Sequence, residues 1–477
     1  MSWVSGLWVL ASIMWCWFWW WKKKVKGTNR ESSGVPKGSL GWPFIGETLE
    51  FIACGYTSRP VTFMDKRRAL YGKVFKSHLL GRPVIVSTDC EVNKVILQND
   101  GRMFAPYYPK SVAILFGESS ILKLNGNLHR RVHGLIGSFF KSHRTKARIT
   151  KDIEECVLLS IDSWNDGQLV YIQDETKNIA FQVLVRALMS VGPGDELQYL
   201  KREFREFFSG LICLPINLPG TTLYKSLKAK ARLLKFVKNL ITGRMERTNK
   251  DGIMDVIDVL LNETSKESEN KLSTDFICGN IVEMMVPGDE SVPAVMTIAV
   301  KYLSDHPLVL KQLLEENMEL KGKKSCLGEP YTWMDYVSLS FTQNVINETL
   351  RMANIINAAW RKALKDVEIK GYLIPKGWCI LTSFSSIHMD EENYKNPYQF
   401  NPWRWQGKEA NYHKDFTPFG GGQRFCPGLD LVRLEISIFL HHFVTRYRWV
   451  AEEDCITYFP MVKVKNRMPI RVAPFST

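Results

Sequence analysis

The amino-acid sequence predicts a mainly helical protein with small β-sheets, in which one large domain follows an apolar N-terminal segment. Helical periodicity dominates between about residue 130 and residue 350, and strand-like segments occur near both ends of the chain. The 477 residues, 45% of them hydrophobic, suffice for a large core, and no internal repeat divides them. We expect an anchor at 1–21, a linker and strap at 22–50, and the main domain at 51–477.

Residues 3–21 form an uncharged apolar run that ends in five aromatic residues. At ~1.5 Å per residue, the run is about as long as the ~30 Å hydrocarbon core of a bilayer is thick. Lysines follow at positions 22, 23, 24 and 26, and such residues stay on the cytosolic side of a membrane. A cleaved signal peptide is the alternative, but its basic region would precede the apolar run. The sequence therefore predicts a single-pass signal-anchor with the main domain in the cytosol.

The segment after the anchor is basic and polar, and then rich in proline and glycine. Residues 35–51, VPKGSLGWPFIGETLEF, place apolar side chains between prolines and glycines that prevent regular structure. We expect a stiff strap that holds the main domain against the membrane.

Charge and cysteine usage narrow the class of protein. The net charge is 63 − 49 = +14, which suits an anionic membrane surface or an acidic protein partner. No basic block alternates with stacking aromatics and no zinc-finger spacing occurs, so nucleic-acid binding is not expected. The ten cysteines include no C-x-x-C pair and are spread like small core residues, as in a reducing compartment.

Individual segments give the expected elements. Residues 73–88 predict two strands around a Gly-Arg-Pro turn, and residues 308–321 predict an amphipathic helix. Strand and loop signals return at 367–384, and a last helix is expected at 429–447.

The stretch FGGGQRFCPG, residues 419–428, surrounds one cysteine with glycines. Glycines allow positive φ and close approach to a flat partner, and oriented N–H groups would stabilise a Cys426 thiolate. Such a thiolate suits haem ligation. A phosphate-binding loop is an alternative, although no G-K-[ST] follows, and an ordinary glycine-rich turn with an incidental cysteine is another.

A second motif lies in a helix that is otherwise apolar. Glu348 and Arg351 are spaced i, i+3 and can pair on one helix face. The same spacing occurs on many surface helices, but a buried pair would need a further partner. Arg404, between Trp403 and Trp405, is the expected third member.

On these residues the chain resembles the cytochrome P-450 superfamily of haem-thiolate monooxygenases, over essentially its whole length. The motif F-x-x-G-x-R-x-C-x-G is matched by Phe419, Gly422, Arg424, Cys426 and Gly428. The motif E-x-x-R is matched by Glu348 and Arg351, and P-x-R-[FW] is matched by Pro402, Arg404 and Trp405. The resemblance implies the cytochrome P-450 fold, a haem b whose iron is ligated by Cys426, and a haem-thiolate catalytic domain at 51–477. It also implies a location on the endoplasmic reticulum membrane.

The family's central helix usually carries [AG]-G-x-[DE]-[TS], and the matching stretch here is VPGDESVP, residues 286–293. The resemblance implies that Glu290 and Ser291 relay protons. Pro287 and Pro293 would each free a carbonyl inside this helix and make a polar notch. The alternative is that the prolines end one helix and begin another around a loop.

Haem propionates need cationic or hydrogen-bonding partners. Where many family members have W-x-x-x-R, this chain has His129 and His133, so we expect His129 with Arg130 or Arg131 to face the propionates. Half of a zinc site without a third ligand and a solvated basic face are the alternatives. By analogy, the further propionate candidates are Arg361 and Arg424.

Two apolar, loop-rich segments, 107–117 and 207–224, lie where the family builds its substrate channel. The second predicts a lid that dips into the membrane, with ordinary core packing as the alternative. The expected pocket residues are Ile114, Phe116, Leu214, Met285, Ala358, Ala359 and Trp360.

Several stretches, including GWPFIGETLEF, LPINLPGT and YLIPKGWC, are similar to the plant branch that oxidises brassinosteroids and related sterols, and above all to the steroid C-23 hydroxylases. The resemblance implies hydroxylation of a brassinosteroid-precursor side chain, at C-23 or a neighbouring carbon, with dioxygen. A bulky Trp360 over the haem would alter the position attacked. A sibling sterol or cholesterol hydroxylase of specialised metabolism, a haem-bound steroid-binding protein, and an isomerase or dehydratase are the alternatives.

Nothing in the sequence resembles a dinucleotide or flavin fold, so electrons must come from a partner. The resemblance implies NADPH–cytochrome reductase in the same membrane. The basic residues expected to dock its acidic face are Arg130, Arg131, Arg424 and Lys414.

Overall fold

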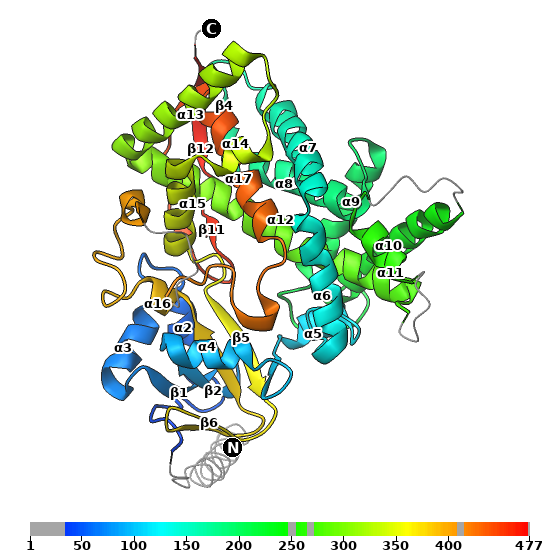
Figure 1. Ribbon diagram of the computed structural model, residues 1–477. Helices are drawn as coiled ribbons and strands as arrows, with labels where there is room; N and C mark the ends of the chain where they lie inside the picture. Colours follow the sequence, from blue (N-terminus) through cyan, green and yellow to red (C-terminus); the bar gives the residue numbers. More distant parts are fainter. Residues whose placement is uncertain (1–33, 247–253, 265–270, 408–414, 476–477) are drawn as a thin grey trace, which may run out of the picture.

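A computed structural model describes residues 34–246, 254–264, 271–407 and 415–475 (Figure 1). Helices make up most of this part of the chain. In chain order, the helices up to the long helix α12 are α2 (Thr48–Cys54), α3 (Thr62–Tyr71), α4 (Cys90–Gln98), α5 (Lys110–Phe116), α6 (Gly126–Lys141), α7 (His143–Ile161), α8 (Ile172–Met189), α9 (Asp195–Ser209), α10 (Thr222–Met245), α11 (Val256–Thr264) and α12 itself (Thr274–Asp305). They are followed by α13 (Pro307–Leu327), α14 (Trp333–Val337), α15 (Ser340–Ala353), α16 (Ser385–His388) and α17 (Leu429–Val444), with short 3-10 turns η1 (Pro402–Trp405) and η2 (Gly422–Arg424).

The strands form four small sheets. The largest has the order β1-β2-β8-β5-β3, built from β1 (Val74–Leu79), β2 (Arg82–Ser87), β8 (Cys379–Ser383), β5 (Ala358–Ala363) and β3 (Phe104–Pro106). Neighbours in it are antiparallel except β2 and β8. A three-stranded sheet has the order β4 (Leu169–Tyr171), β12 (Pro469–Pro474), β9 (Tyr447–Ala451). One two-stranded sheet pairs β6 (Val367–Ile369) with β7 (Tyr372–Ile374), and another pairs β10 (Ile456–Thr457) with β11 (Lys463–Val464).

Helix α12 runs through the middle of the helical body, with α8, α10, α15 and α17 packed around it (Figure 1). The side chain of Ser273 caps its first turn by accepting from the Phe276 N–H at 3.1 Å. Pro287 and Pro293 both lie inside the helix, so the alternative in which they end it is wrong. The hydroxyls of Ser291 and Thr297 donate to the carbonyls of Pro287 and Pro293, four residues before each.

The strap is fixed to the first sheet. Gly38 pairs with Lys76 of β1, and a Cβ at Gly38 or at Gly46 would clash with the β1 backbone. The chain can pass this close only because these residues lack a side chain. The described part of the strap is thus held against β1, and its role in holding the domain at a membrane stays a prediction.

The predicted elements are confirmed in type. The segment 73–88 contains β1 and β2, 308–321 lies inside α13, and 429–447 contains α17 before β9 begins at Tyr447. Among the helices of the described ranges, none combines the length and apolar character needed to span a bilayer. The anchor predicted at residues 1–21 lies outside the described residues.

Candidate active site

Cys426 lies in the loop between η2 and α17 and is partly buried. Its backbone N–H donates to the Phe419 carbonyl at 3.2 Å, which closes the loop. Burial raises the pKa of the Cys426 thiol, and a hydrogen bond from the Gly428 N–H partly opposes that rise. The Gly428 N–H acts in the direction expected from the sequence, but desolvation outweighs it in the free protein. A cation at Sγ would reverse the balance, because a coordinating thiol loses its proton.

Two of the glycines before Cys426 lie against α4. Gly422 has φ +65°, and a Cβ there would clash with the Leu97 carbonyl at the end of α4. The neighbouring Gly421 also packs on the Leu97 side chain. These two glycines therefore let the loop approach α4 closely, and their approach to a flat ligand stays a prediction. Gly428 has φ −93°, so it needs no left-handed conformation.

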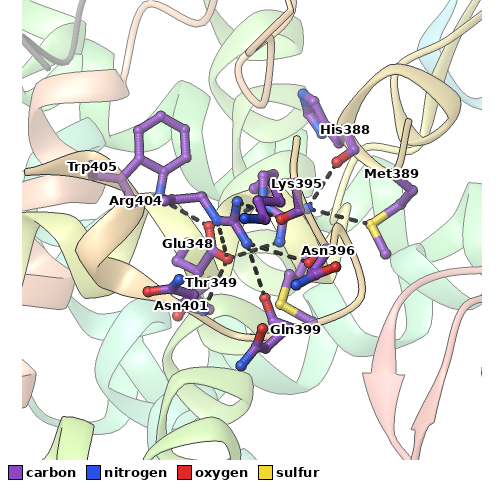
Figure 2. Close-up of polar contacts among 12 residues, drawn as sticks. Glu348, Thr349, His388, Met389, Lys395, Asn396, Gln399, Asn401, Arg404 and Trp405 are labelled. Atoms are coloured by element: carbon purple, nitrogen blue, oxygen red, sulfur yellow. Dashed lines mark hydrogen bonds and ion pairs between the residues drawn. The ribbon is translucent and has the colours of Figure 1, made fainter. Parts of the chain in front are cut away.

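The predicted triad is assembled as expected (Figure 2). Arg351 and Arg404 both bond the fully buried Glu348 carboxylate, Arg351 at 2.8 and 2.9 Å and Arg404 at 2.9 Å. The Trp405 indole and the Asn401 backbone N–H add donors at 2.9 and 3.1 Å. A buried carboxylate with this many donors is well compensated. The triad holds η1 against α15.

Arg424 and Arg361 share one acid that the sequence did not single out. Arg424 Nε and Arg361 Nε lie 2.6 and 3.3 Å from the carboxylate of Asp100, which is buried between them. Arg424 also donates to carbonyls of the segment before α6, at residues 121, 122 and 124, and to Asn125. Arg424 is thus largely occupied by protein partners. Arg361 Nε makes no hydrogen bond.

The remaining propionate candidates lie on different faces of helix α6. His129 is buried, and desolvation together with the nearby Arg424 lowers its pKa to about 4. His133 contacts the Phe425 carbonyl of the cysteine loop at 2.8 Å. Arg130 is exposed and pairs with Asn127, and Arg131 pairs with Glu263 of α11. The structure therefore brings His129 and His133 towards the loop, but not Arg130 or Arg131.

Glu290 points away from Ser291. Lys177 of α8 pairs with the Glu290 carboxylate at 2.6 Å. Lys177, Asp289 and Glu290 all line a cleft of about 310 Å³ between α8, α9 and α12. The Ser291 hydroxyl is turned towards the Pro287 carbonyl. Burial and the neighbouring Glu290 raise the pKa of Asp289 to about 6. A larger surface pocket of about 650 Å³ contains none of the predicted site residues.

The predicted pocket residues divide into two groups. Phe116 and Met285 are buried in one core cluster, and Ile114 lies half-exposed on α5. Leu214 is different, because its side chain is 75% exposed in the loop after α9. The structure therefore removes Leu214 from the expected pocket wall and places it on the surface.

The expected pocket residues on strand β5 face two different sides of the sheet. Ala358 and Trp360 pack on the core cluster around Phe75 and Leu381, on the side of α3. Successive strand residues face opposite ways, so Ala359 shares the opposite face with Arg361. Because Arg361 lies beside Asp100 and the cysteine loop, Ala359 faces the site and Trp360 does not. The expectation that Trp360 covers the haem is therefore not met.

Comparisons with known proteins agree with this geometry. The family model for cytochrome P-450 matches residues 36–466. The chain belongs to the cytochrome P-450 family. The chain is 59% identical to 3-epi-6-deoxocathasterone 23-monooxygenase CYP90C1 of Arabidopsis thaliana, over 98% of this chain and 92% of the relative. It is 55% identical to the 23-monooxygenase CYP90D1 of the same plant, over 91% and 89%. The resemblance to steroid C-23 hydroxylases is thereby confirmed.

More distant matches agree on the fold of this cytochrome P-450. Cholesterol 16,22-dihydroxylase CYP90G4 of Trigonella foenum-graecum is 37% identical over 98% of this chain and 96% of the relative. The solved structure of retinoic acid-bound cyanobacterial CYP120A1 superposes with a TM-score of 0.81 at 23% identity, covering 93% of this chain and all of that one. The predicted fold is confirmed.

The site of this cytochrome P-450 fits the haem-thiolate group that its family implies. Cys426 offers a partly buried sulfur with one N–H donor beside it. Arg361 offers a buried guanidinium whose Nε makes no hydrogen bond, and its low solvation depresses its pKa. Arg361 and Arg424 share the single carboxylate of Asp100, so the cluster keeps one positive charge that an anionic propionate would offset. His129 adds a neutral, buried imidazole close by.

Sequence reasoning missed three contributors to the site of this cytochrome P-450. Asp100 lies in an ordinary turn sequence, and no local pattern marks it. His388 and Lys230 likewise gain their importance from partners far away in the chain. A buried acid between two motif arginines could have been expected only from charge balance.

Proposed function

We propose that this cytochrome P-450 is a membrane-bound monooxygenase that hydroxylates the side chain of a plant steroid, at C-23 or a neighbouring carbon. The carrying observation is the partly buried Cys426 loop, with the buried Glu348 triad, in a chain 59% identical to a 23-monooxygenase. Dioxygen is the oxidant, one oxygen atom enters the C–H bond, and the other leaves as water. NADPH supplies the two electrons through a membrane-bound reductase.

Each residue has a distinct part in this proposal. Cys426 would ligate the iron, and Arg361 and His129 would hold the propionates. When bound, the haem supplies the activation of dioxygen. The Ser291 hydroxyl, which donates to the Pro287 carbonyl, can accept and donate a proton. Glu290, held by Lys177, lines the cleft from which protons would enter.

The membrane location is supported by exposed apolar side chains on two segments. Ile212, Leu214, Ile216 and Leu218, in the loop after α9, are each between 47 and 75% exposed. In the strap, Trp42 is 78% exposed. Such surfaces are costly in water and suit a lipid boundary. Together with the anchor predicted at 1–21, they favour an endoplasmic reticulum membrane protein with its domain in the cytosol.

Reductase docking is proposed on the side of Arg130, which is exposed on α6. Arg131 and Arg424 are engaged by protein partners, so they are weaker candidates than the sequence suggested. Lys414 lies outside the described residues.

The deciding experiment uses membranes that contain the full chain and a plant reductase. Reduced, CO-treated protein should show the long-wavelength Soret band of thiolate-ligated haem, and Cys426→Ser should abolish it. Supplied with NADPH, the membranes should convert a 22-hydroxylated campesterol derivative to a 23-hydroxylated product. Retention of the band in Cys426→Ser would refute the assignment. Conversion of cholesterol alone would favour the sibling sterol hydroxylase, and a band without any product would favour a steroid-binding protein.

A further inference from the structure

His388 is a fully buried histidine at the end of α16, and neither the motifs nor the proposed reaction uses it. Its Nε2 accepts from the Thr417 backbone N–H at 3.0 Å, and its Nδ1 lies 2.8 Å from Asn354 Oδ1. A backbone N–H can only donate, so Nε2 carries no proton and Nδ1–H is the donor to Asn354. Burial and the nearby Arg351 lower the pKa of His388 to about 3, so the ring stays neutral in the cell.

The same residue is bonded twice to α15, the helix that carries Glu348 and Arg351. Arg351 Nη1 donates to the His388 carbonyl at 2.8 Å, as Figure 2 shows. Asn354, the left-handed cap of α15 at φ 48°, donates through its own amide nitrogen to the Met352 carbonyl at 3.3 Å. That bond turns the Asn354 oxygen towards His388. The imidazole is therefore oriented from the end of α15.

On its other side, His388 is linked to the cysteine loop. The Thr417 carbonyl accepts from the Gly420 N–H at 3.0 Å, and the Phe419 carbonyl accepts from the Cys426 N–H at 3.2 Å. The ring of Phe416, just before Thr417, lies between the rings of His388 and Trp405, with centroids 5.7 and 4.5 Å away. A continuous path of polar contacts thus runs from the triad to the backbone of Cys426.

We propose that His388 is a positioning residue for the cysteine loop. Its neutral imidazole fixes Thr417 relative to α15 and thereby sets where Cys426 presents its sulfur to the iron. The inference rests on the proposed function in one respect, namely that Cys426 ligates haem iron. Without the Nε2 acceptor, the Thr417 N–H is left buried and unbonded, and the start of the loop must shift to find a partner.

The test compares His388→Phe, which keeps a ring of similar shape but no hydrogen bonds, with His388→Gln, which keeps an acceptor for Thr417. The readout is the ratio of thiol-ligated to thiolate-ligated haem in the Soret spectrum of the reduced, CO-bound full chain. We expect about a tenfold rise in that ratio for His388→Phe, the size expected when a buried N–H loses its acceptor, and recovery of most of it in His388→Gln.

A matched control separates positioning from general loss of stability. His442 is another buried histidine, and its Nε2 contacts the Tyr336 hydroxyl at 3.1 Å, at the far end of α17 from the cysteine loop. His442→Phe should lower the unfolding temperature but leave the Soret ratio as in the wild type. If His388→Phe does not fold, Asn354→Gly serves instead, because it keeps the left-handed cap and removes the acceptor of Nδ1–H together with the local bond to the Met352 carbonyl. It should shift the ratio in the same direction.

The outcomes are separable. A wild type without the thiolate-type band would defeat the proposed function. A wild type with the band, together with a folded His388→Phe that has the same ratio, would overturn the positioning role alone. Equal shifts in His388→Phe and His442→Phe would overturn it too, because the loss would then be general.

Discussion

At the scale of single residues, neighbours on β5 differ in function because successive side chains face opposite sides of the sheet. Ala359 shares its face with Arg361, and Trp360 packs on the hydrophobic cluster by α3. The position of oxidation should therefore depend on Ala359 and not on the larger Trp360 beside it.

This assignment predicts that Ala359→Phe changes which carbon is oxidised or lowers turnover at least tenfold, because the added ring would fill the site. Trp360→Ala should keep the same product while lowering the free energy of unfolding by about 2 kcal/mol, less than for a fully buried tryptophan. Product analysis by mass spectrometry and urea unfolding measure the two effects. An altered product from Trp360→Ala with none from Ala359→Phe would contradict the assignment.

At the scale of elements, one buried ion pair joins helices α5, α10 and α12. Lys230 of α10 pairs with Glu283 of α12 at 2.8 Å and also donates to the Leu115 carbonyl at the end of α5. Glu283 is almost fully buried, and its Oε2 makes no hydrogen bond. Burial raises the pKa of Glu283, and Lys230 opposes that rise. The segment that contains Ile114 and Phe116 is thus tied to the central helix.

Removing one partner should therefore be costly. Lys230→Met leaves a buried carboxylate without its cation and should lower the free energy of unfolding by about 3 kcal/mol, whereas Lys230→Met with Glu283→Gln should recover most of that loss. Lys301→Met, on the helix α12 that carries Glu283, is the control. Its partner Asp305, at 3.0 Å, is half-exposed, so the cost should be about 0.5 kcal/mol. A double variant as unstable as Lys230→Met would contradict the coupling, as measured by urea unfolding.

At the scale of the whole molecule, buried groups of opposite type set how stability depends on pH. Burial lowers the pKa values of His388, His441 and His442 to about 3, 4 and 2, and it raises that of Glu435 to about 8. Below about pH 6.5 these histidines bind protons in the unfolded chain but stay neutral in the folded state. The free energy of unfolding therefore rises with pH in that range. Between about pH 4.5 and 8 the folded state keeps a proton on Glu435 that the unfolded chain loses, so this carboxyl lowers stability as pH rises.

The histidines outnumber Glu435, so stability should pass through a maximum near about pH 6.5 and fall towards pH 8. Glu435→Gln should remove the fall at higher pH, since the amide has no proton to lose. Unfolding midpoints in urea at intervals from pH 5 to about 8.5 would check this. A decline between neutral and alkaline pH that is unchanged in Glu435→Gln would contradict the assignment.

Local patterns predicted much of the site because the groups concerned are close in the chain. Glu348 and Arg351 are one helical turn apart, so their pairing follows from helix geometry. The Cys426 motif, the strap and the long helix through Pro287 were likewise evident from short stretches. What these patterns could not supply is orientation. Arg130 and His129 are adjacent, yet one faces solvent and the other the cysteine loop.

The sequence by itself determined the family, the cysteine motif and the steroid substrate class, because these depend on residue identity and local spacing. Only the tertiary structure decided the partners of the motif residues. Arg424 meets Asp100, Gly422 meets Leu97, and His388 meets Thr417. These contacts join segments from 29 to more than 300 residues apart, so no local periodicity encodes them. They exist because burial forces each polar group and each close backbone approach to find a partner from another element.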